Sequence, residues 1–287
     1  MARPWLLIDA PHLAYRAYYS TGGLTHNGKL TGVVYGFLRE LANLADRFDT
    51  DRVGFFFEGG KLLRSGVFPG YKLRADTEER KQVKAQIKLL KDVVLPKLGF
   101  RRVFSYPGYE ADDLIAQAVN QLCLGDRPLV VVSGDKDLLQ MLHKPNVSVY
   151  DPKAKVSTTF DRFSKVMGVS PAFWPRIKAL VGCTTDSLPG LDGVGEATAI
   201  KFVNGTLPTH LLRYRQCRKA VEDPTSVFHR NLKLVTLPYE GTPELVFDKD
   251  DLSRAKWLAV CEEYGLRSLV NHFPVGGKTR DLLQGAA

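Results

Sequence analysis

Short apolar runs alternate with longer amphipathic stretches through the first half of the chain. The runs have the length of buried strands, and the stretches between them repeat apolar positions at helical spacing. This alternation is typical of an α/β domain with a mostly parallel central sheet flanked by helices. We predict strands at Trp5–Ile8, Val53–Phe57, Arg102–Ser105, Leu129–Ser133 and Val147–Tyr150, and helices at Thr31–Phe48 and Ala111–Leu122.

After about Phe160 the β-branched runs fade, and helical stretches separated by Pro and Gly take over. We therefore predict an α/β domain over residues 1–158 and a helical domain over residues 159–287. The helices expected in the second domain are Pro171–Val181, Glu196–Val203 and Leu252–Tyr264.

The charge balance indicates a class of partner. Lys and Arg total 40 against 31 Asp and Glu, a formal net charge of +9, and a basic surface attracts polyanions such as nucleic acid. Ordinary solubility charge is the alternative, and charge alone does not decide. Because no apolar run could cross a bilayer, no export signal is visible and the four cysteines lack zinc or disulfide spacing, we expect a cytoplasmic protein without a membrane partner.

Acidic residues follow four of the predicted strands. The carboxyl ends of parallel strands meet at one edge of a sheet, where ligands bind. The residues are Asp9, Glu58, Glu110, Asp112, Asp113, Asp135 and Asp137. Any one of them could simply cap a helix, but that explanation is weak for seven. So many carboxylates together require cations, and hard oxygen ligands select Mg²⁺ or Mn²⁺, which favours metal-assisted phosphodiester hydrolysis.

Four motifs together resemble the 5′ nucleases, a family that includes phage flap endonucleases and the 5′ nuclease domain of bacterial DNA polymerase I. In order along the chain they are Leu7-Ile8-Asp9 with Arg16, Gly108-Tyr109-Glu110-Ala111-Asp112-Asp113, Ser133-Gly134-Asp135-Lys136-Asp137-Leu138-Leu139-Gln140, and Asp186-Ser187-Leu188-Pro189-Gly190 continuing to Gly193-Val194-Gly195-Glu196. The second and third motifs, which contain Tyr109-Glu110-Ala111-Asp112-Asp113 and Gly134-Asp135-Lys136-Asp137, are together highly specific for this family.

The resemblance implies a resolvase-like (PIN) nuclease core with a helical arch and a two-metal phosphodiesterase that acts on branched or 5′-flap DNA in replication and repair. Asp135 is then catalytic, and the implied metal ligands are Asp9, Glu58, Glu110, Asp112, Asp113, Asp135, Asp137 and Asp186.

Two residues depart from the family pattern. Glu58 stands where the family usually has Asp, so we expect it to contact metal through water. Cys183 stands where the family carries an aspartate three residues before Asp186. Because a thiol is a poor Mg²⁺ ligand, we expect the second ion to bind weakly or be displaced, and activity either to be reduced or to depend more on Mn²⁺.

A basic stretch precedes the acidic motifs. From Lys61 to Lys91 there are nine Lys or Arg against three acids; a solvated helix packed on the core is one explanation. Within the resemblance, residues 61–95 form the arch, Tyr71 stacks on an unpaired base, and Lys72 and Arg74 are catalytic and contact DNA. Lys72 would stabilise charge at phosphorus. The family's arginine position itself holds Ala75.

A glycine-rich segment lies between the two predicted helices at about 171–204. Gly190, Gly193 and Gly195 let the backbone approach a phosphate, and the resemblance makes this segment a helix-hairpin-helix that grips duplex DNA, with Lys201 and Arg16 as further DNA contacts. Such hairpins often hold a K⁺ through backbone carbonyls, so a K⁺ is allowed here. The segment Gly276–Thr279 lacks the context of a nucleotide-binding loop, and we reject that activity.

The leading hypothesis is therefore a monomeric, stand-alone 5′-3′ exonuclease and flap endonuclease. A catalytically weak DNA-binding relative is the alternative, because Glu58 and Cys183 alter the acidic set. A metal-dependent ribonuclease on a similar acidic α/β domain is a third.

Overall fold

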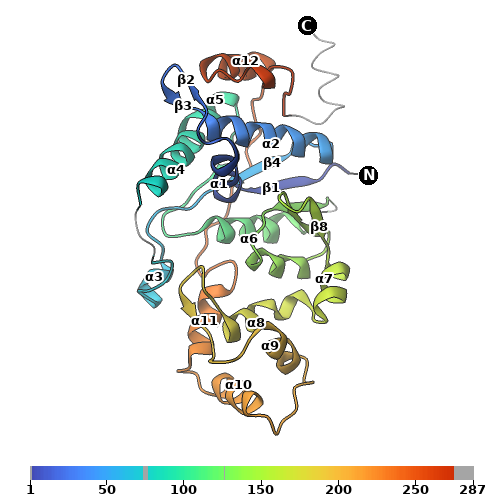
Figure 1. The fold of residues 1–287 in the computed structure, drawn as a ribbon. Helices are drawn as coiled ribbons and strands as arrows, with labels where there is room; N and C mark the ends of the chain where they lie inside the picture. The colour runs from blue at the N-terminus through green and yellow to red at the C-terminus, as the bar shows by residue number, and fades with distance from the viewer. Residues whose placement is uncertain (1, 74–76, 126, 275–287) are drawn as a thin grey trace.

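The computed structural model describes residues 2–73, 77–125 and 127–274. Its centre is a six-stranded sheet in the order β5-β4-β1-β6-β7-β8, parallel throughout except for the antiparallel β7–β8 pair (Figure 1). The prediction of a mostly parallel sheet flanked by helices is confirmed. The strands are β1 (Trp5–Asp9), β4 (Val53–Phe56), β5 (Val103–Phe104), β6 (Leu129–Val132), β7 (Val147–Asp151) and β8 (Val156–Thr158).

Both faces of the sheet are buried, which explains why its strands read as continuous apolar runs. Successive side chains of a strand point to opposite faces, so Leu7 packs in one core and its neighbours Leu6 and Ile8 pack in the other. All three are fully buried. Phe56 and Phe55 of the adjacent strand divide in the same way.

Helices cover both faces. One face carries α1 (Ala10–Thr21), α2 (Gly32–Phe48), α5 (Leu95–Leu98) and α12 (Arg254–Glu263), and the other carries α6 (Ala111–Leu122). A small hairpin, β2 (Thr25–His26) and β3 (Lys29–Leu30), joins α1 to α2. The predicted arch region contains α3 (Arg64–Val67), α4 (Glu78–Leu89) and a π-helical turn at Leu90–Val94.

Below the sheet, as Figure 1 is drawn, lies a group of helices from the second half of the chain. They are α7 (Phe160–Met167), α8 (Trp174–Val181), α9 (Glu196–Val203), α10 (Leu212–Glu222) and α11 (Val227–Val235). Between α8 and α9 the chain forms a short antiparallel pair, β9 (Gly182–Cys183) and β10 (Leu188–Pro189). Among the described residues, no helix is long and apolar enough to cross a bilayer.

The last part of the chain corrects the predicted domain division. Helix α12 does not join the lower helices: its Trp257 is fully buried in the same core as Leu6 and Ile8 of the sheet. The segment leading to it is anchored by Arg102, whose guanidinium lies 2.9 Å from the Asp250 carboxylate. A single helical domain over 159–287 is therefore wrong for this segment, because an amphipathic pattern fixes a helix and its apolar face but not the surface on which that face packs.

Candidate metal centre

Asp9 ends the central strand and begins the helix that follows it. Its Oδ1 accepts a hydrogen bond from the His12 backbone N–H at 3.1 Å, which caps α1. Its Oδ2 accepts from the Ser133 hydroxyl at 2.6 Å, which ties β1 to the end of β6. Asp9 is 6% exposed. The cap and the strand ends therefore hold one carboxylate in a buried position at the carboxyl edge of the sheet.

Beside Asp9 a small cavity collects five of the predicted metal ligands. The carboxylates that line it are Glu110, Asp112, Asp135, Asp137 and Asp186, and the cations that line it are Arg64 and Lys72. The five carboxylates come from the N-terminus of α6, the turn after β6 and the turn between β9 and β10. The sheet edge, the start of α6 and the β9–β10 turn thus bring together residues that are up to 177 positions apart, from Asp9 to Asp186.

The cationic side chains around this cavity do not balance the negative charge of its carboxylates. Burial raises the pKa of Asp112 well above its ordinary value, and the neighbouring Asp135 and Asp9 raise it further. Burial, with Asp135 as a repelling neighbour, also raises the pKa of Asp9 and of Asp137 despite nearby cationic groups. A divalent cation bound among these oxygens would remove this repulsion, and an all-oxygen donor set fits Mg²⁺ or Mn²⁺.

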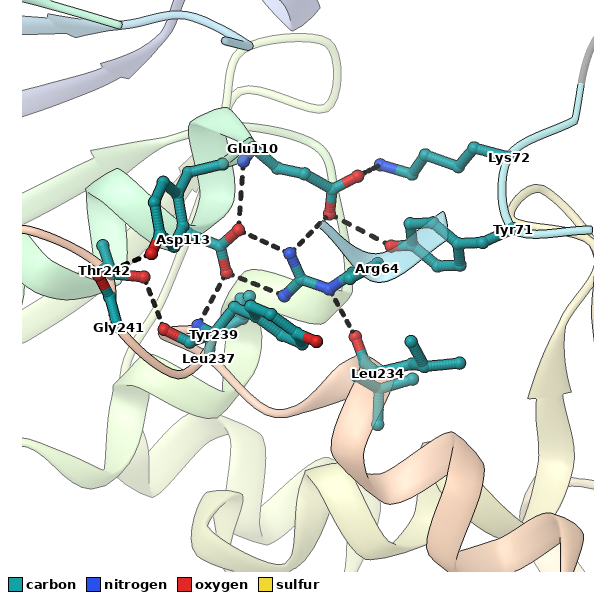
Figure 2. Close-up of polar contacts among 12 residues, drawn as sticks. Arg64, Tyr71, Lys72, Glu110, Asp113, Leu234, Leu237, Tyr239, Gly241 and Thr242 are labelled. Atoms are coloured by element: carbon teal, nitrogen blue, oxygen red, sulfur yellow. Dashed lines mark hydrogen bonds and ion pairs between the residues drawn. The ribbon is translucent and has the colours of Figure 1, made fainter. Parts of the chain in front are cut away.

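A buried arginine joins three parts of the chain next to the acidic cavity (Figure 2). Arg64 of α3 is 1% exposed. Its guanidinium pairs with both oxygens of Asp113, and its Nε donates to the Leu234 carbonyl of α11 at 2.7 Å. It also lies 3.3 Å from Glu110. The base of the predicted arch is therefore fixed to α6 and to α11 by one fully enclosed charge.

The structure gives Asp113 a different role from the predicted metal ligand. Both of its oxygens are occupied: Oδ1 accepts from Arg64 and from the Tyr239 backbone N–H at 2.8 Å, and Oδ2 accepts from Arg64 and from the Glu110 backbone N–H at 3.0 Å. The side chain is fully buried. Asp113 points away from its neighbour Asp112 because successive helical residues face different directions. It stabilises the N-terminus of α6 and is not placed to hold an ion.

Glu110 lines the acidic cavity and also contacts two residues of the predicted arch region. Its Oε1 lies 2.6 Å from Lys72 Nζ, and its Oε2 accepts from the Tyr71 hydroxyl at 3.0 Å (Figure 2). Burial alone would lower the pKa of Lys72, but Glu110 first among its neighbours raises that pKa well above the ordinary value, so the ammonium stays charged.

Tyr71 is 7% exposed and its hydroxyl is used by Glu110. Its ring lies in the core cluster that contains Leu114 and Leu138. The predicted role of Tyr71 as a stacking platform for an unpaired base therefore does not fit its position, because a stacking face must be open to solvent.

A second group of donors lies at the turn between β9 and β10. One oxygen each of Asp137 and Asp186 and the sulfur of Cys183 lie within 4.8 Å of one another. Lys178 of α8 lies 2.8 Å from Asp137 Oδ1. The Lys72 backbone N–H donates to the Asp186 carbonyl at 2.9 Å, so the arch base is also tied to this turn.

Glu58 and Arg16 lie outside the acidic cavity. Glu58 follows β4, is exposed and lines a separate groove whose other wall is the basic side of α4, with Lys84 and Lys88. Arg16 is half-buried on α1, and its Nη1 is enclosed without a hydrogen-bond partner among the described residues.

The backbone of the glycine-rich segment requires glycine at two positions. A Cβ at Gly190 would lie 2.0 Å from the Val181 carbonyl oxygen, so only glycine fits where the chain passes the end of α8. Gly193 has a positive φ of 64°. Gly195 precedes the first residue of α9 with open space beside it, and Lys201 is exposed on that helix. Arg74, predicted as a catalytic residue, lies outside the described residues.

Two cations of this centre were missed by the sequence reasoning. Arg64 was counted only as part of a basic stretch, and Lys178 was counted only as part of a predicted helix. The one available signal for Lys178 was its position five residues before Cys183. No sequence signal distinguishes a fully buried arginine from an exposed one, because the distinction depends on Asp113 and Leu234 reaching it from distant segments.

Comparison with known proteins adds independent findings. The model of the 5′-3′ exonuclease N-terminal resolvase-like domain matches residues 4–168. The 5′-3′ exonuclease of Aquifex aeolicus is 30% identical over 260 residues, which cover 87% of this chain and 89% of that protein. DNA polymerase I of Mycobacterium leprae is 36% identical over 206 residues, 69% of this chain. The chain spans only 22% of that polymerase and 27% of the one from Thermus aquaticus.

Solved structures show the same fold at low sequence identity. The 5′-exonuclease of bacteriophage T5, described with bound divalent zinc ions, is 22% identical with a TM-score of 0.65, and the match covers 82% of this chain and 90% of that one. The catalytic core of Rad2 in complex with DNA substrate is 15% identical with a TM-score of 0.53, and the match covers 99% of this chain and 91% of that one.

Proposed function

The chain belongs to the 5′-3′ exonuclease family with an N-terminal resolvase-like domain, and from this we propose that it is a divalent-metal-dependent 5′ nuclease that hydrolyses phosphodiester bonds of branched, nicked or 5′-flap DNA. The observation that carries the proposal is the group of carboxylates Asp9, Asp112 and Asp135 at the carboxyl edge of the sheet, where burial and repulsion from Asp135 raise the pKa of Asp9 and of Asp112 and call for a cation. The similarity to the 5′-3′ exonuclease of Aquifex aeolicus supports the proposal.

The residues divide into two groups around the scissile phosphate. Asp9, Asp112 and Asp135 would hold the first cation, and Asp137 and Asp186 would contribute to the second. Bound to the first group, Mg²⁺ or Mn²⁺ would supply a hydroxide at neutral pH and charge stabilisation for phosphate oxygens. Glu110 does not need to touch an ion in this arrangement, because its oxygens already hold Lys72 and Tyr71.

Lys72 is the protein's own charge next to this centre. Its ammonium lies 2.6 Å from Glu110 and 3.8 Å from Asp186, and it is 22% exposed on the cavity wall. A cation fixed at this position would stabilise the negative charge that develops on the phosphate oxygens. The Lys72 backbone has a positive φ of 48°, and its N–H donates to the Asp186 carbonyl, which fixes the segment beside the site.

We expect Lys72→Met to lower the rate of flap cleavage by roughly 10²-fold, since removing one preorganised donor costs about that much. Single-turnover cleavage of a labelled 5′-flap duplex measures it. The matched control is Lys97→Met: Lys97 of α5 pairs with Glu263 of α12, outside the acidic cavity, and its loss should leave the rate unchanged. Equal rates for the Lys72 variant and the wild type would remove Lys72 from the mechanism.

The lower helices supply a surface for duplex DNA. The backbone at Gly193 and Gly195 and the start of α9 would hold a phosphate, with Lys201 beside it and a K⁺ bound by the carbonyls of this hairpin. Arg16, half-buried on α1, would be a further contact to a phosphate. Such contacts carry no sequence information, so selection would rest on DNA shape.

The experiment that tests the function compares one branched substrate made of DNA and of RNA. We expect cleavage of the 5′-flap DNA with Mg²⁺ or Mn²⁺, loss of cleavage on chelation with EDTA and recovery on metal addition, and little cleavage of the RNA flap. Flap binding without cleavage in either metal would instead favour the catalytically weak DNA-binding relative. Preferential cutting of the RNA flap would favour a ribonuclease.

A further inference from the structure

The second group of donors is chemically mixed. The β9–β10 pairing sets Cys183 opposite Leu188, and the turn between them returns Asp186 to the same side, so that Cys183 Sγ and oxygens of Asp186 and Asp137 lie within 4.8 Å of one another. Two ligands of one ion are separated by at most two bond lengths, about 4.6 Å for bonds of about 2.3 Å. Small side-chain adjustments would therefore place all three donors on one ion.

We propose that this cluster is a mixed sulfur and oxygen site that binds a thiophilic divalent ion of the Zn²⁺ class, with Cys183 as a ligand, in preference to Mg²⁺. Soft thiolate ligands favour such ions, whereas carboxylate oxygens alone favour Mg²⁺. A role of this site in DNA cleavage rests on the proposed function. Binding of the metal ion does not depend on that function and can be measured separately. As the sulfur–metal bond forms, the S–H bond breaks and the proton passes to solvent.

The charges around the cluster are compatible with this ion. A thiolate and two carboxylates carry three negative charges, and the Lys178 ammonium, 2.8 Å from Asp137, carries one positive charge. The Lys72 ammonium, 3.8 Å from Asp186, is balanced by Glu110 at 2.6 Å and adds no net charge. A divalent ion makes the sum zero. The immediate surroundings are shielded, because Asp186 is 7% exposed and Cys183 is half-buried. The Cys183 sulfur lies 3.0 Å from the Thr185 hydroxyl, a neutral partner that it can exchange for an ion.

The other cysteines provide internal controls. Cys217 and Cys261 are buried in the apolar cores, and Cys123 is half-buried at the end of α6, where its sulfur donates to the Asn120 carbonyl. Only Cys183 is grouped with carboxylates in a cluster of potential metal ligands within the described residues.

The test is a titration of metal-free protein with Cd²⁺, followed by the ultraviolet thiolate-to-cadmium charge-transfer band. We expect the band in the wild type and in Cys123→Ser and its loss in Cys183→Ser. Zn²⁺ should displace Cd²⁺ and abolish the band, whereas excess Mg²⁺ should not. By competition titration, Cys183→Ser should weaken Zn²⁺ binding at the cluster by about tenfold or more, which corresponds to about 1.4 kcal/mol.

A second variant keeps the outcome decisive. Cys183→Asp should lose the band and gain Mg²⁺ binding, because the cluster then has oxygen donors alone. A band that persists in Cys183→Ser, or that Mg²⁺ displaces in the wild type, would show that the thiol is not a ligand and overturn the inference. A Cys183-dependent band in a protein that cleaves no substrate would leave the site standing and remove the proposed nuclease function instead.

Discussion

Asp135→Asn is expected to reduce cleavage of 5′-flap DNA by roughly 10³-fold or more, which corresponds to about 4 kcal/mol of lost transition-state stabilisation. Asp135 is the carboxylate that repels three others, since it contributes to the raised pKa of Asp9, Asp112 and Asp137. It therefore lies at the centre of the negative charge that cations must neutralise. Single-turnover cleavage in saturating Mg²⁺ and in Mn²⁺ measures the change.

Asparagine is a conservative replacement at this position. Asp135 Oδ1 accepts from the Asp137 backbone N–H at 2.8 Å, and the amide oxygen of asparagine can keep that bond. The matched control is Asp161→Asn, which removes an exposed aspartate from the first turn of α7 and should leave cleavage unchanged. Flap binding measured in Ca²⁺ should be retained or tightened, because one negative charge is lost. A cleavage rate within tenfold of the wild type would contradict the assignment.

Asp113→Leu is expected to lower the free energy of unfolding by about 3–5 kcal/mol, because it leaves the buried charge of Arg64 without its bidentate partner, which Glu110 at 3.3 Å only partly replaces. Both side chains are enclosed, at 0% and 1% exposure. The substitution also frees the backbone N–H groups of Glu110 and Tyr239, which lose their acceptor. Urea denaturation followed by circular dichroism measures the loss.

The double variant Arg64→Leu with Asp113→Leu separates a lost charge pair from lost packing. Removing both charges should recover part of the stability lost by the single variant, since replacing a whole buried pair by apolar groups is far less costly than breaking it. Arg218→Leu breaks an exposed ion pair with Glu222 and should leave stability unchanged. Additive losses in the double variant would show that the two residues act independently.

The amino-acid sequence predicted the elements that carry the site. The apolar runs that became β1, β4, β6 and β7 lie within one residue of their expected bounds, and Ala111–Leu122 and Glu196–Val203 are helices as predicted. Because the sheet is parallel, acids at the strand ends had to approach one edge. The sequence therefore predicts that Asp9, Asp112, Asp135 and Asp137 lie near one another. Which of them hold ions stays a prediction.

Only the tertiary structure decided which way each side chain points and which residues it contacts. Asp112 and Asp113 are adjacent in sequence, yet Asp112 lines the acidic cavity and Asp113 pairs with Arg64, because helical geometry turns them apart and a residue 49 positions away reaches only one of them. Tyr71 and α12 show the same limit: both are buried against surfaces that their own segments do not specify. Residue pattern sets which groups are available locally, whereas long-range packing sets which groups meet, and the meeting of Cys183 with Asp137 and Asp186 belongs to the second kind.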